Sequence, residues 1–280
     1  MIQNLSITAL VENTAGRVDC LGEWGLALWI EADRHRILYD TGQGRTLLEN
    51  AKILGINLKD ADALIISHGH HDHTGGIAAV MATEFHGQIY AHPGVFGKRY
   101  QQNEDAPPKS RGIPAAAEQA LRSAGKRLID SSKPTELAPG LVLTGAIPRR
   151  TDFEDTGVKH FLDEACTQPD PIVDDQALLI ETGQGWVVVT GCGHSGAVNA
   201  LKYATDVTGS RRIHAVLGGM HLLSASAERL RATVDGFQDF GVKIVVPCHC
   251  TGFHATGLFQ SRYGADALPL RAGLKVKLAE

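Results

Sequence analysis

The sequence predicts an α/β fold in which two mixed β-sheets pack face to face and helices cover their outer faces. Four apolar runs of strand length each end in a loop that is marked by glycine or proline and carries histidine. Strands and helices also follow one another in a similar order in the two halves of the chain, as expected for layers that share a core. We therefore expect a single domain over residues 1–280, with a surface excursion at about residues 94–172.

The first half of the chain alternates β-prone runs with turn-forming loops. Residues 61–67 are a continuous apolar run, which is typical of a strand buried on both faces. Residues 45–54 place apolar side chains at helical spacing, and Gly55 follows as a residue that can end a helix. The expected strands are 5–11, 27–31, 35–39, 61–67 and 89–92, and the expected helices are 45–54, 77–83 and 115–127.

The second half of the chain also alternates predicted strands with loops and helices. Residues 177–182 and 186–190 predict a hairpin around Gly183-Gln184-Gly185. We expect further strands at 213–217 and 242–246, and helices at 197–205 and 225–240. Each strand–loop–helix unit brings its loop to the carboxyl edge of a sheet, where ligands usually bind.

Composition narrows the class of protein. The chain has 280 residues, 43% of them hydrophobic, and a formal net charge of −4, so it can bury a large core and has no field that would attract nucleic acid. No apolar run approaches the ~20 residues of a membrane span, and the first residues do not resemble an export signal. Five cysteines, an odd and sparse set, argue against a disulfide framework. We expect a cytoplasmic protein with a small-molecule substrate, and self-association into a homo-oligomer stays open.

The run 68–73 is the strongest functional signal. An extended backbone directs His68 and His70 to one side, Asp72 continues the alternation, and His73 lies where the chain turns into a helix. Imidazole nitrogen and carboxylate oxygen are ligands of zinc-like ions. We expect His68 and His70 to hold one ion and Asp72 and His73 a second, while His71 points away. A structural zinc site is the main alternative, although such sites favour cysteine-rich sets.

Other candidate ligands follow the strands of the second half. His194 and His249 each come just after an apolar run, and we expect both to complete the metal site. His221 has the same placement and is either a ligand or a group that transfers protons or contacts substrate. Cys192 is either a soft ligand or a small buried residue. Cys248 and Cys250 alternate around His249, so we expect both to face away from the site and to pack in the core.

Two carboxylates outside the run 68–73 are further candidates. Asp40 follows a predicted strand and either supports a metal-binding histidine or caps the next helix. Asp175, in the pair Asp174-Asp175 before another predicted strand, either reaches the site or is simply solvated.

The motif Ser67-His68-Gly69-His70-His71-Asp72-His73-Thr74-Gly75-Gly76 resembles the signature loop of the metallo-β-lactamase superfamily. The segment Leu38-Tyr39-Asp40-Thr41-Gly42 is similar to the strand of that family that ends in Asp-Thr-Gly. A narrower resemblance covers nearly the whole chain. It includes Thr190-Gly191-Cys192-Gly193-His194-Ser195-Gly196 and Gly218-Gly219-Met220-His221-Leu222, and it is to the subgroup named for dihydropterin ribofuranosylaminobenzene phosphate synthase.

The resemblance implies an αββα sandwich and a metallohydrolase that attacks a carbonyl or phosphorus centre with metal-activated water. It implies one or two divalent ions, zinc first, with manganese or iron as alternatives. Asp72 and His221 are then the expected catalytic residues, and Arg149 is expected to hold a phosphate of the substrate. Superfamily enzymes commonly have a bridging aspartate where this chain has Cys192. A bridging thiolate, a missing bridge and a substitution by His194 all stay open.

Three functions remain at this point. The first is a hydrolase, or a transferase that displaces phosphate or diphosphate, acting on a small phosphorylated and pterin-related substrate. The second is a hydrolase of the lactonase or thioesterase type. The third is a metal-binding redox or sensor protein without turnover, a reading that the cysteines near the histidines keep open.

Overall fold

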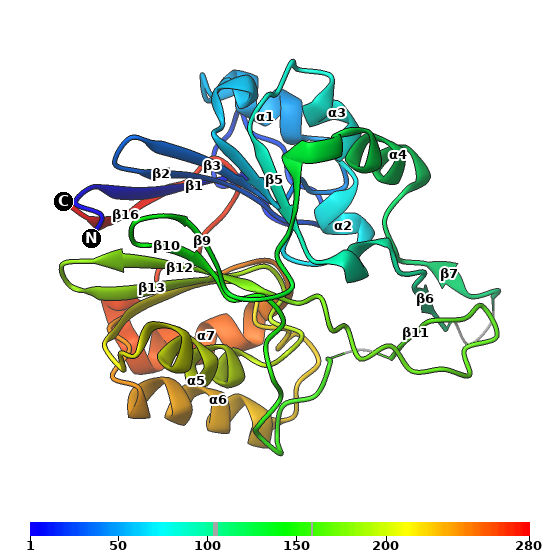
Figure 1. Ribbon diagram of the computed structural model, residues 1–280. Coiled ribbons are helices and arrows are strands. Elements are labelled where there is room, and N and C mark those ends of the chain that lie inside the picture. Colours follow the sequence, from blue (N-terminus) through cyan, green and yellow to red (C-terminus); the bar gives the residue numbers. More distant parts are fainter. Residues whose placement is uncertain (103–105, 158) are drawn as a thin grey trace.

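The structure, a computed structural model, describes residues 1–102, 106–157 and 159–280. Its elements form four layers, helices–sheet–sheet–helices, as Figure 1 shows. One outer layer holds α1 (Leu47–Ile53), α3 (Ile77–Met81) and α4 (Ala115–Ser123), and the other holds α5 (Ala197–Thr208), α6 (Ala227–Asp239) and α7 (Phe253–Tyr263). The predicted α/β sandwich of two packed sheets is therefore confirmed.

The first sheet has seven strands and carries the predicted histidine loop. Three parallel pairings join β3, β4, β5 and β8, and the remaining pairings are antiparallel, so the sheet is mixed. In spatial order its strands are β16 (Lys275–Ala279), β1 (Leu5–Val11), β2 (Ala27–Ala32), β3 (His35–Tyr39), β4 (Ala63–Ile65), β5 (Gln88–Ala91) and β8 (Leu128–Asp130).

The second sheet has six strands and is also mixed. β13, β14 and β15 run parallel, while β12, β10 and β9 add antiparallel pairings. Its spatial order is β15 (Ile244–Pro247), β14 (Ile213–Gly218), β13 (Gly185–Thr190), β12 (Ala177–Thr182), β10 (Leu141–Leu143) and β9 (Thr135–Ala138). Each sheet thus contributes parallel strands whose carboxyl ends can meet at one edge.

Alternation along the strands divides the apolar side chains between three cores. In β12, Leu178 and Ile180 join the core between the sheets, whereas Ala177 and Leu179 join the core under α5 and α6. A third core lies between the first sheet and α1, α3 and α4. Because successive side chains of a strand point to opposite faces, a strand that is covered on both faces reads as a continuous apolar run.

Most expected elements are present, with bounds shifted by a few residues at their ends. The apolar run 61–67 is strand only over Ala63–Ile65, because Asp40 binds the backbone of Ser67 and ends the pairing there. Further short helices are α2 (His71–Thr74) and the 3-10 turns Leu58–Asp60, Pro93–Phe96, Gly125–Arg127, His249–Thr251 and Gly264–Asp266. Among the described residues no helix is long and apolar enough to cross a membrane.

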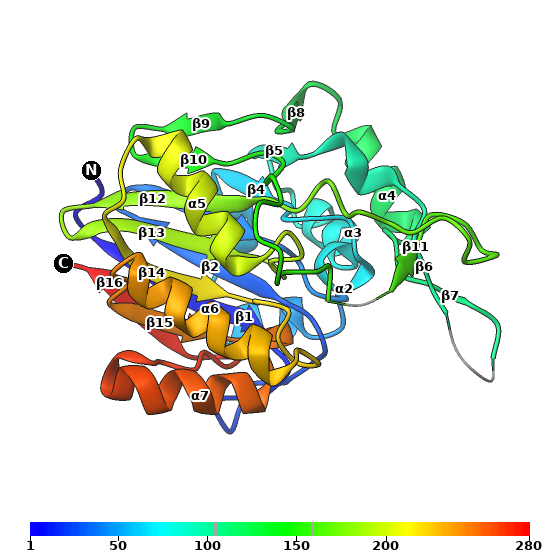
Figure 2. The same ribbon diagram turned by 90° about the horizontal axis from the view of Figure 1, so that it is seen from below.

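The prediction of a surface excursion over residues 94–172 is wrong for much of that range. Helix α4 covers the first sheet, and β8, β9 and β10 are strands of the two main sheets. What projects from the sandwich is a small sheet of β11 (His160–Phe161), β6 (Tyr100–Gln101) and β7 (Lys109–Ser110), visible at the side of the molecule in Figure 2. Polar composition indicated a loop, but it could not show that short apolar stretches inside it pair with distant strands.

Candidate metal centre

Three imidazole nitrogens converge next to the end of β4. His70 Nδ1 lies 2.9 Å from His68 Nε2 and 3.1 Å from His194 Nε2. His68 and His70 come from the loop after β4, whereas His194 comes from the loop after β13 in the other sheet. All three side chains are buried. We call these residues the first donor set.

A second group of donors lies beside the first. His73 Nε2 is 3.2 Å from His249 Nε2, and Asp72 Oδ2 is 3.6 Å from the same His249 nitrogen. Asp72 and His73 belong to helix α2, and His249 follows β15. These three residues form the second donor set. The sequence predicted this division of the run 68–73 into two pairs, and the structure brings His194 to the first pair and His249 to the second.

Cys192 stands between the two donor sets. Its Sγ lies 3.1 Å from His73 Nε2. The ligand atoms of His68, His194 and Cys192 lie within 4.8 Å of one another, and so do those of His73, His249 and Cys192. A thiolate at this position can contact both sets, which is the place that a bridging carboxylate would take.

Hydrogen bonds on the outer side of the rings decide which nitrogen carries the proton. His73 Nδ1 lies 2.7 Å from Asp40 Oδ2, and His194 Nδ1 lies 2.8 Å from the carbonyl oxygen of Thr156. Carboxylate and carbonyl oxygens can only accept, so both Nδ1 atoms donate, and in the neutral ring Nε2 keeps its lone pair.

The same logic applies to the other two rings. Ser67 Oγ donates to Asp40 Oδ2 and therefore accepts from His68 Nδ1. Asn13 Oδ1 accepts from Gly25 N and lies 2.9 Å from His249 Nδ1. Four Nε2 atoms thus point inward with their lone pairs in the neutral rings. Asp40 lies behind two of them, which favours histidine support over a helix cap, the other role that the sequence left open.

Burial and charge set the protonation of the site. Burial lowers the pKa of His68, His70 and His194, and it lowers that of His249 to about 3. Burial also lowers the pKa of His73, but the Asp40 carboxylate outweighs it and raises the value to about 9. Except for His73, the rings are neutral near pH 7, and neutral imidazole is the form that binds metal.

The donor geometry fits divalent ions. Nitrogens bound to one tetrahedral zinc at about 2.0–2.1 Å lie about 3.3 Å apart, close to the separations of 2.9–3.2 Å found here. His70 Nε2 is buried, and no hydrogen-bond partner for it is present in the described part of the chain. Nitrogens this close need either a proton or a shared cation between them, and a metal ion can take that place, so these residues can hold one ion in each donor set.

Close approach of the backbone explains a glycine inside the metal loop. A Cβ atom at Gly69 would meet the carbonyl oxygen of Val95 at 2.6 Å. The backbone N–H of Gly69 donates to Asp174 Oδ2 over 2.8 Å, and Asp174 in turn is paired with the buried Arg99. The loop between His68 and His70 is thus held by a carboxylate from the segment before β12.

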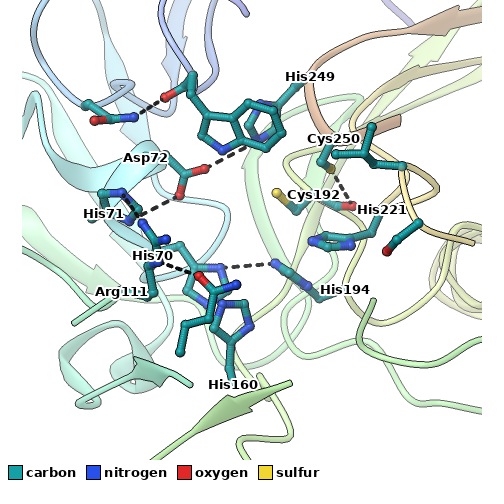
Figure 3. A pocket seen from close by; sticks show the side chains of 15 residues that line it. His70, His71, Asp72, Arg111, His160, Cys192, His194, His221, His249 and Cys250 are labelled. Atoms are coloured by element: carbon teal, nitrogen blue, oxygen red, sulfur yellow. Dashed lines mark hydrogen bonds and ion pairs between the residues drawn. The ribbon is translucent and has the colours of Figure 1, made fainter. Parts of the chain in front are cut away.

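A pocket of about 480 Å³ opens over the donor sets. Figure 3 shows His70, Asp72, Cys192, His194 and His249 around it. Its other lining residues are Trp24, Gln43, His71, Gln101, Arg111, His160, His221, Leu223, Ser224 and Cys250. A small molecule can therefore reach both donor sets from one side.

Two histidines that the sequence singled out, His221 and His71, both line the pocket. His221 lines the pocket with its ring 4.3 Å from that of His194, and its Nδ1 has no partner among the described residues. His71, expected to point away, also lines the pocket, with Nδ1 3.6 Å from Asp72 Oδ1.

Arg149 and Asp175 do not line the pocket, so their predicted contact with substrate is not supported. Arg149 is exposed and donates to the carbonyl oxygen of Pro171. Asp175 is buried and accepts from Ser195 N over 2.7 Å, which supports the loop that carries His194. Burial raises the pKa of Asp175 to about 6.

The prediction for the last cysteine pair is half wrong. Cys248 packs in the core between the sheets, as expected. Cys250 instead lines the pocket, and its Sγ donates to the carbonyl oxygen of Cys192. The prediction assumed an extended chain, but residues 249–251 form a 3-10 turn with a positive φ at His249, which removes the alternation.

Sequence reasoning missed several other residues of the pocket, four of which are placed to contact a substrate. His160 of β11 lies with its ring 4.4 Å from that of His70, and Trp24 lies with its ring 5.4 Å from that of His249. Arg111 and Gln101 come from the small projecting sheet and its flank, joined by a 2.8 Å hydrogen bond. No local pattern marks Gln101, Arg111 and His160, because the pairing of β6 with β7 and β11 brings them to the site.

Comparisons with known proteins agree with the fold. Residues 25–165 match the metallo-β-lactamase superfamily. A protein of Methanocaldococcus jannaschii named 7,8-dihydropterin-6-methyl-4-(β-D-ribofuranosyl)-aminobenzene-5′-phosphate synthase is 32% identical, over 99% of this chain and 97% of its own length.

Solved structures show the same fold. A metal-dependent hydrolase of the β-lactamase superfamily is 27% identical and superposes with a TM-score of 0.78, covering 99% of this chain and 100% of that one. Zn²⁺-bound PqqB from Methylobacterium extorquens is 12% identical, covers 97% of this chain and 99% of its own, and has a TM-score of 0.57, which shows a shared fold.

Proposed function

The chain belongs to the metallo-β-lactamase superfamily, and from this premise we propose that it is a metal-dependent enzyme acting on a small phosphorylated, pterin-related substrate. The reaction is hydrolysis at phosphorus, or the closely related displacement of phosphate or diphosphate by a second substrate. Its centre consists of one or two divalent ions, zinc in the first place, held by the first and second donor sets.

One observation carries the proposal: two donor sets share Cys192 at the floor of one pocket. A structural zinc site is closed by four protein ligands, whereas a catalytic site leaves a position open to substrate. Here His70, Asp72, His194 and His249 all line the pocket. The donors are therefore reachable, which favours catalysis over a purely structural role.

Each donor is held in place by a neighbour of the chain. Asp40 and the carbonyl oxygen of Thr156 keep the protons of His73 and His194 on Nδ1. Asp72 adds a carboxylate to the second set. When bound, the ions supply Lewis acidity and lower the pKa of a coordinated water to about 7. His160, buried beside His70, is placed to hydrogen-bond a substrate group above the first set.

Arg111 replaces Arg149 as the expected phosphate contact. Arg111 lines the pocket, and a guanidinium binds phosphate oxygens through two parallel hydrogen bonds. Trp24 is 47% exposed at the pocket and can stack on a planar ring. The name of the Methanocaldococcus relative contains a dihydropterin, an aminobenzene ring and a phosphate. A cation and an aromatic face in one pocket support a substrate of that class.

The test measures metal content and turnover together. Untagged protein is analysed for bound metal, and a panel of phosphodiesters, phosphate monoesters and diphosphates is compared with lactones and thioesters. Chelator is then added to the active preparation. We expect between one and two ions per chain, turnover in the phosphate group of the panel, and loss of activity on chelation.

Matched variants separate catalysis from folding. His70→Ala and Asp72→Ala remove one donor from each set, whereas His254→Ala removes an exposed histidine outside the pocket. We expect the first two to lose metal and activity and His254→Ala to keep both. Metal-free protein with chelator-resistant activity would overturn the proposal, and turnover confined to lactones or thioesters would move it to the second class.

A further inference from the structure

A third group of donors adjoins the two donor sets. The ligand atoms of Cys192, His221 and Cys250 lie within 4.8 Å of one another, on three loops that follow β13, β14 and β15. Figure 3 shows the three side chains together on one wall of the pocket. We propose that they form a soft donor set, so that Cys250 and His221 are metal ligands alongside Cys192. This inference rests on the proposed metal centre, because Cys192 is shared.

The backbone is shaped to bring Cys250 to this wall. His221 has a φ of 48° and His249 a φ of 51°, in the left-handed region that few residues other than glycine adopt. The N–H groups of Leu222 and Leu223 both donate to the carbonyl oxygen of Cys250, over 3.1 and 3.2 Å. Strained residues that persist on adjacent loops are typical of functional sites.

The loop after β14 packs closely against Cys250. A Cβ atom at Gly219 would meet Cys250 Sγ at 2.7 Å. Gly219 N donates to the carbonyl oxygen of Gly191 over 3.0 Å, which joins the loop to the one that carries Cys192. The three loops are thus tied to one another at the point where the two sulfur atoms and the imidazole meet.

The side chains of this group are poorly satisfied without a cation. Cys250 Sγ makes a 3.4 Å hydrogen bond to the carbonyl oxygen of Cys192, and a thiol is a weak donor. His221 Nδ1 is buried, and no partner for it is found in residues 1–102, 106–157 and 159–280. Binding of a divalent ion would release the two thiol protons and use both sulfurs and the imidazole as ligands.

The chemical class of the ion follows from the donors. Thiolates favour zinc, iron and copper(I), whereas manganese and magnesium prefer oxygen donors. Two sulfurs and one imidazole therefore select zinc or iron for this position. The sequence position of His221 leaves open a metal ligand, a proton-transfer group or a substrate contact, and the geometry points to the ligand.

The test uses Cys250→Ala with Cys248→Ala as the matched control, because Cys248 lies two residues away in the core and outside the pocket. Both variants and the wild type are loaded with cobalt(II), and the thiolate-to-cobalt charge-transfer absorption and the bound metal per chain are measured. We expect Cys250→Ala to lose about half of that absorption, together with bound metal, while Cys248→Ala matches the wild type. Equal absorption and metal content in Cys250→Ala and the wild type would overturn the inference.

A measurement on the wild type covers the case in which Cys250→Ala does not fold. X-ray absorption of the zinc-loaded wild type reports the sulfur neighbours of the metal. Sulfur from two cysteines supports the inference, and sulfur from one or none overturns it. Two sulfur ligands without any turnover would refute the proposed function alone, whereas wild-type protein that binds no metal would refute both.

Discussion

Arg99 connects the projecting segment to the metal loop, and its removal should be costly. The guanidinium is 3% exposed and is paired with Asp170 and Asp174. Asp174 is also the acceptor for the backbone N–H of Gly69. Arg99→Met keeps the apolar stem but removes the charge, so two carboxylates stay buried without their partner.

The expected loss of stability follows from the burial of this ion pair. A hydrogen bond to a charged group contributes about 1.5–3 kcal/mol, and breaking a buried ion pair on one side costs about 3–5 kcal/mol. We expect Arg99→Met to lower the free energy of unfolding by about 4 kcal/mol, a large part of the ~5–15 kcal/mol of an ordinary domain. Arg99→Lys keeps the charge without the planar fork and should lose less.

Urea unfolding of metal-loaded protein measures this loss, with Arg122→Met as the control. Arg122 pairs with Glu118 on the surface of α4, where its side chain is 56% exposed, and such pairs contribute between about 0 and 1 kcal/mol. If Arg99→Met and Arg122→Met cost the same, within about 1 kcal/mol, the reasoning from buried charge is refuted.

Three further predictions concern the site. Asp40→Asn should weaken metal binding about 10–100-fold, because it removes the carboxylate that accepts from His73 Nδ1 and so directs the Nε2 lone pair inward. Competition with a chromogenic chelator measures the affinity, and an unchanged affinity would contradict the prediction. Burial raises the pKa of Asp175 to about 6. Between about pH 4 and 6 the carboxyl group is therefore protonated in the folded state but ionised in the unfolded state. The free energy of unfolding falls as the pH rises through this window. Asp175→Asn should therefore be more stable than wild type above about pH 6, by up to roughly 3 kcal/mol, and the two unfolding free energies should converge near pH 4. Finally, Arg111→Ala should raise the KM for a phosphorylated substrate about tenfold or more in steady-state kinetics, while Arg149→Ala leaves the KM unchanged. A larger rise in KM for Arg149→Ala than for Arg111→Ala would restore Arg149 as the phosphate contact.

Local patterns predicted the elements and the first donors well. The strands Leu5–Val11 and Ala177–Thr182 begin and end at the predicted residues. A strand buried on both faces needs apolar side chains at every position, and that pattern is readable without the fold. The donors of the run 68–73 are equally local, because two-residue alternation and the start of a helix separate them into two pairs.

Other residues could not be placed from the sequence. An extended chain would place Cys250 in the core, whereas the 3-10 turn after β15 directs it to the pocket. Arg111 reaches the pocket and Arg149 does not, although both belong to segments of loop-like composition. Their positions depend on pairing with strands far away in the chain, which leaves no periodic signal near the residues themselves.

The sequence by itself determined the two layers of sheet and the four inward-facing residues of the loop after β4, because periodicity and short-range spacing are properties of neighbouring residues. Only the tertiary structure decided that Cys192 stands between both donor sets, that Asp40 directs His73, and that His160 and Arg111 border the pocket. These relations join residues separated by tens to more than one hundred positions, and they exist only once the carboxyl ends of strands from the two sheets meet at one edge.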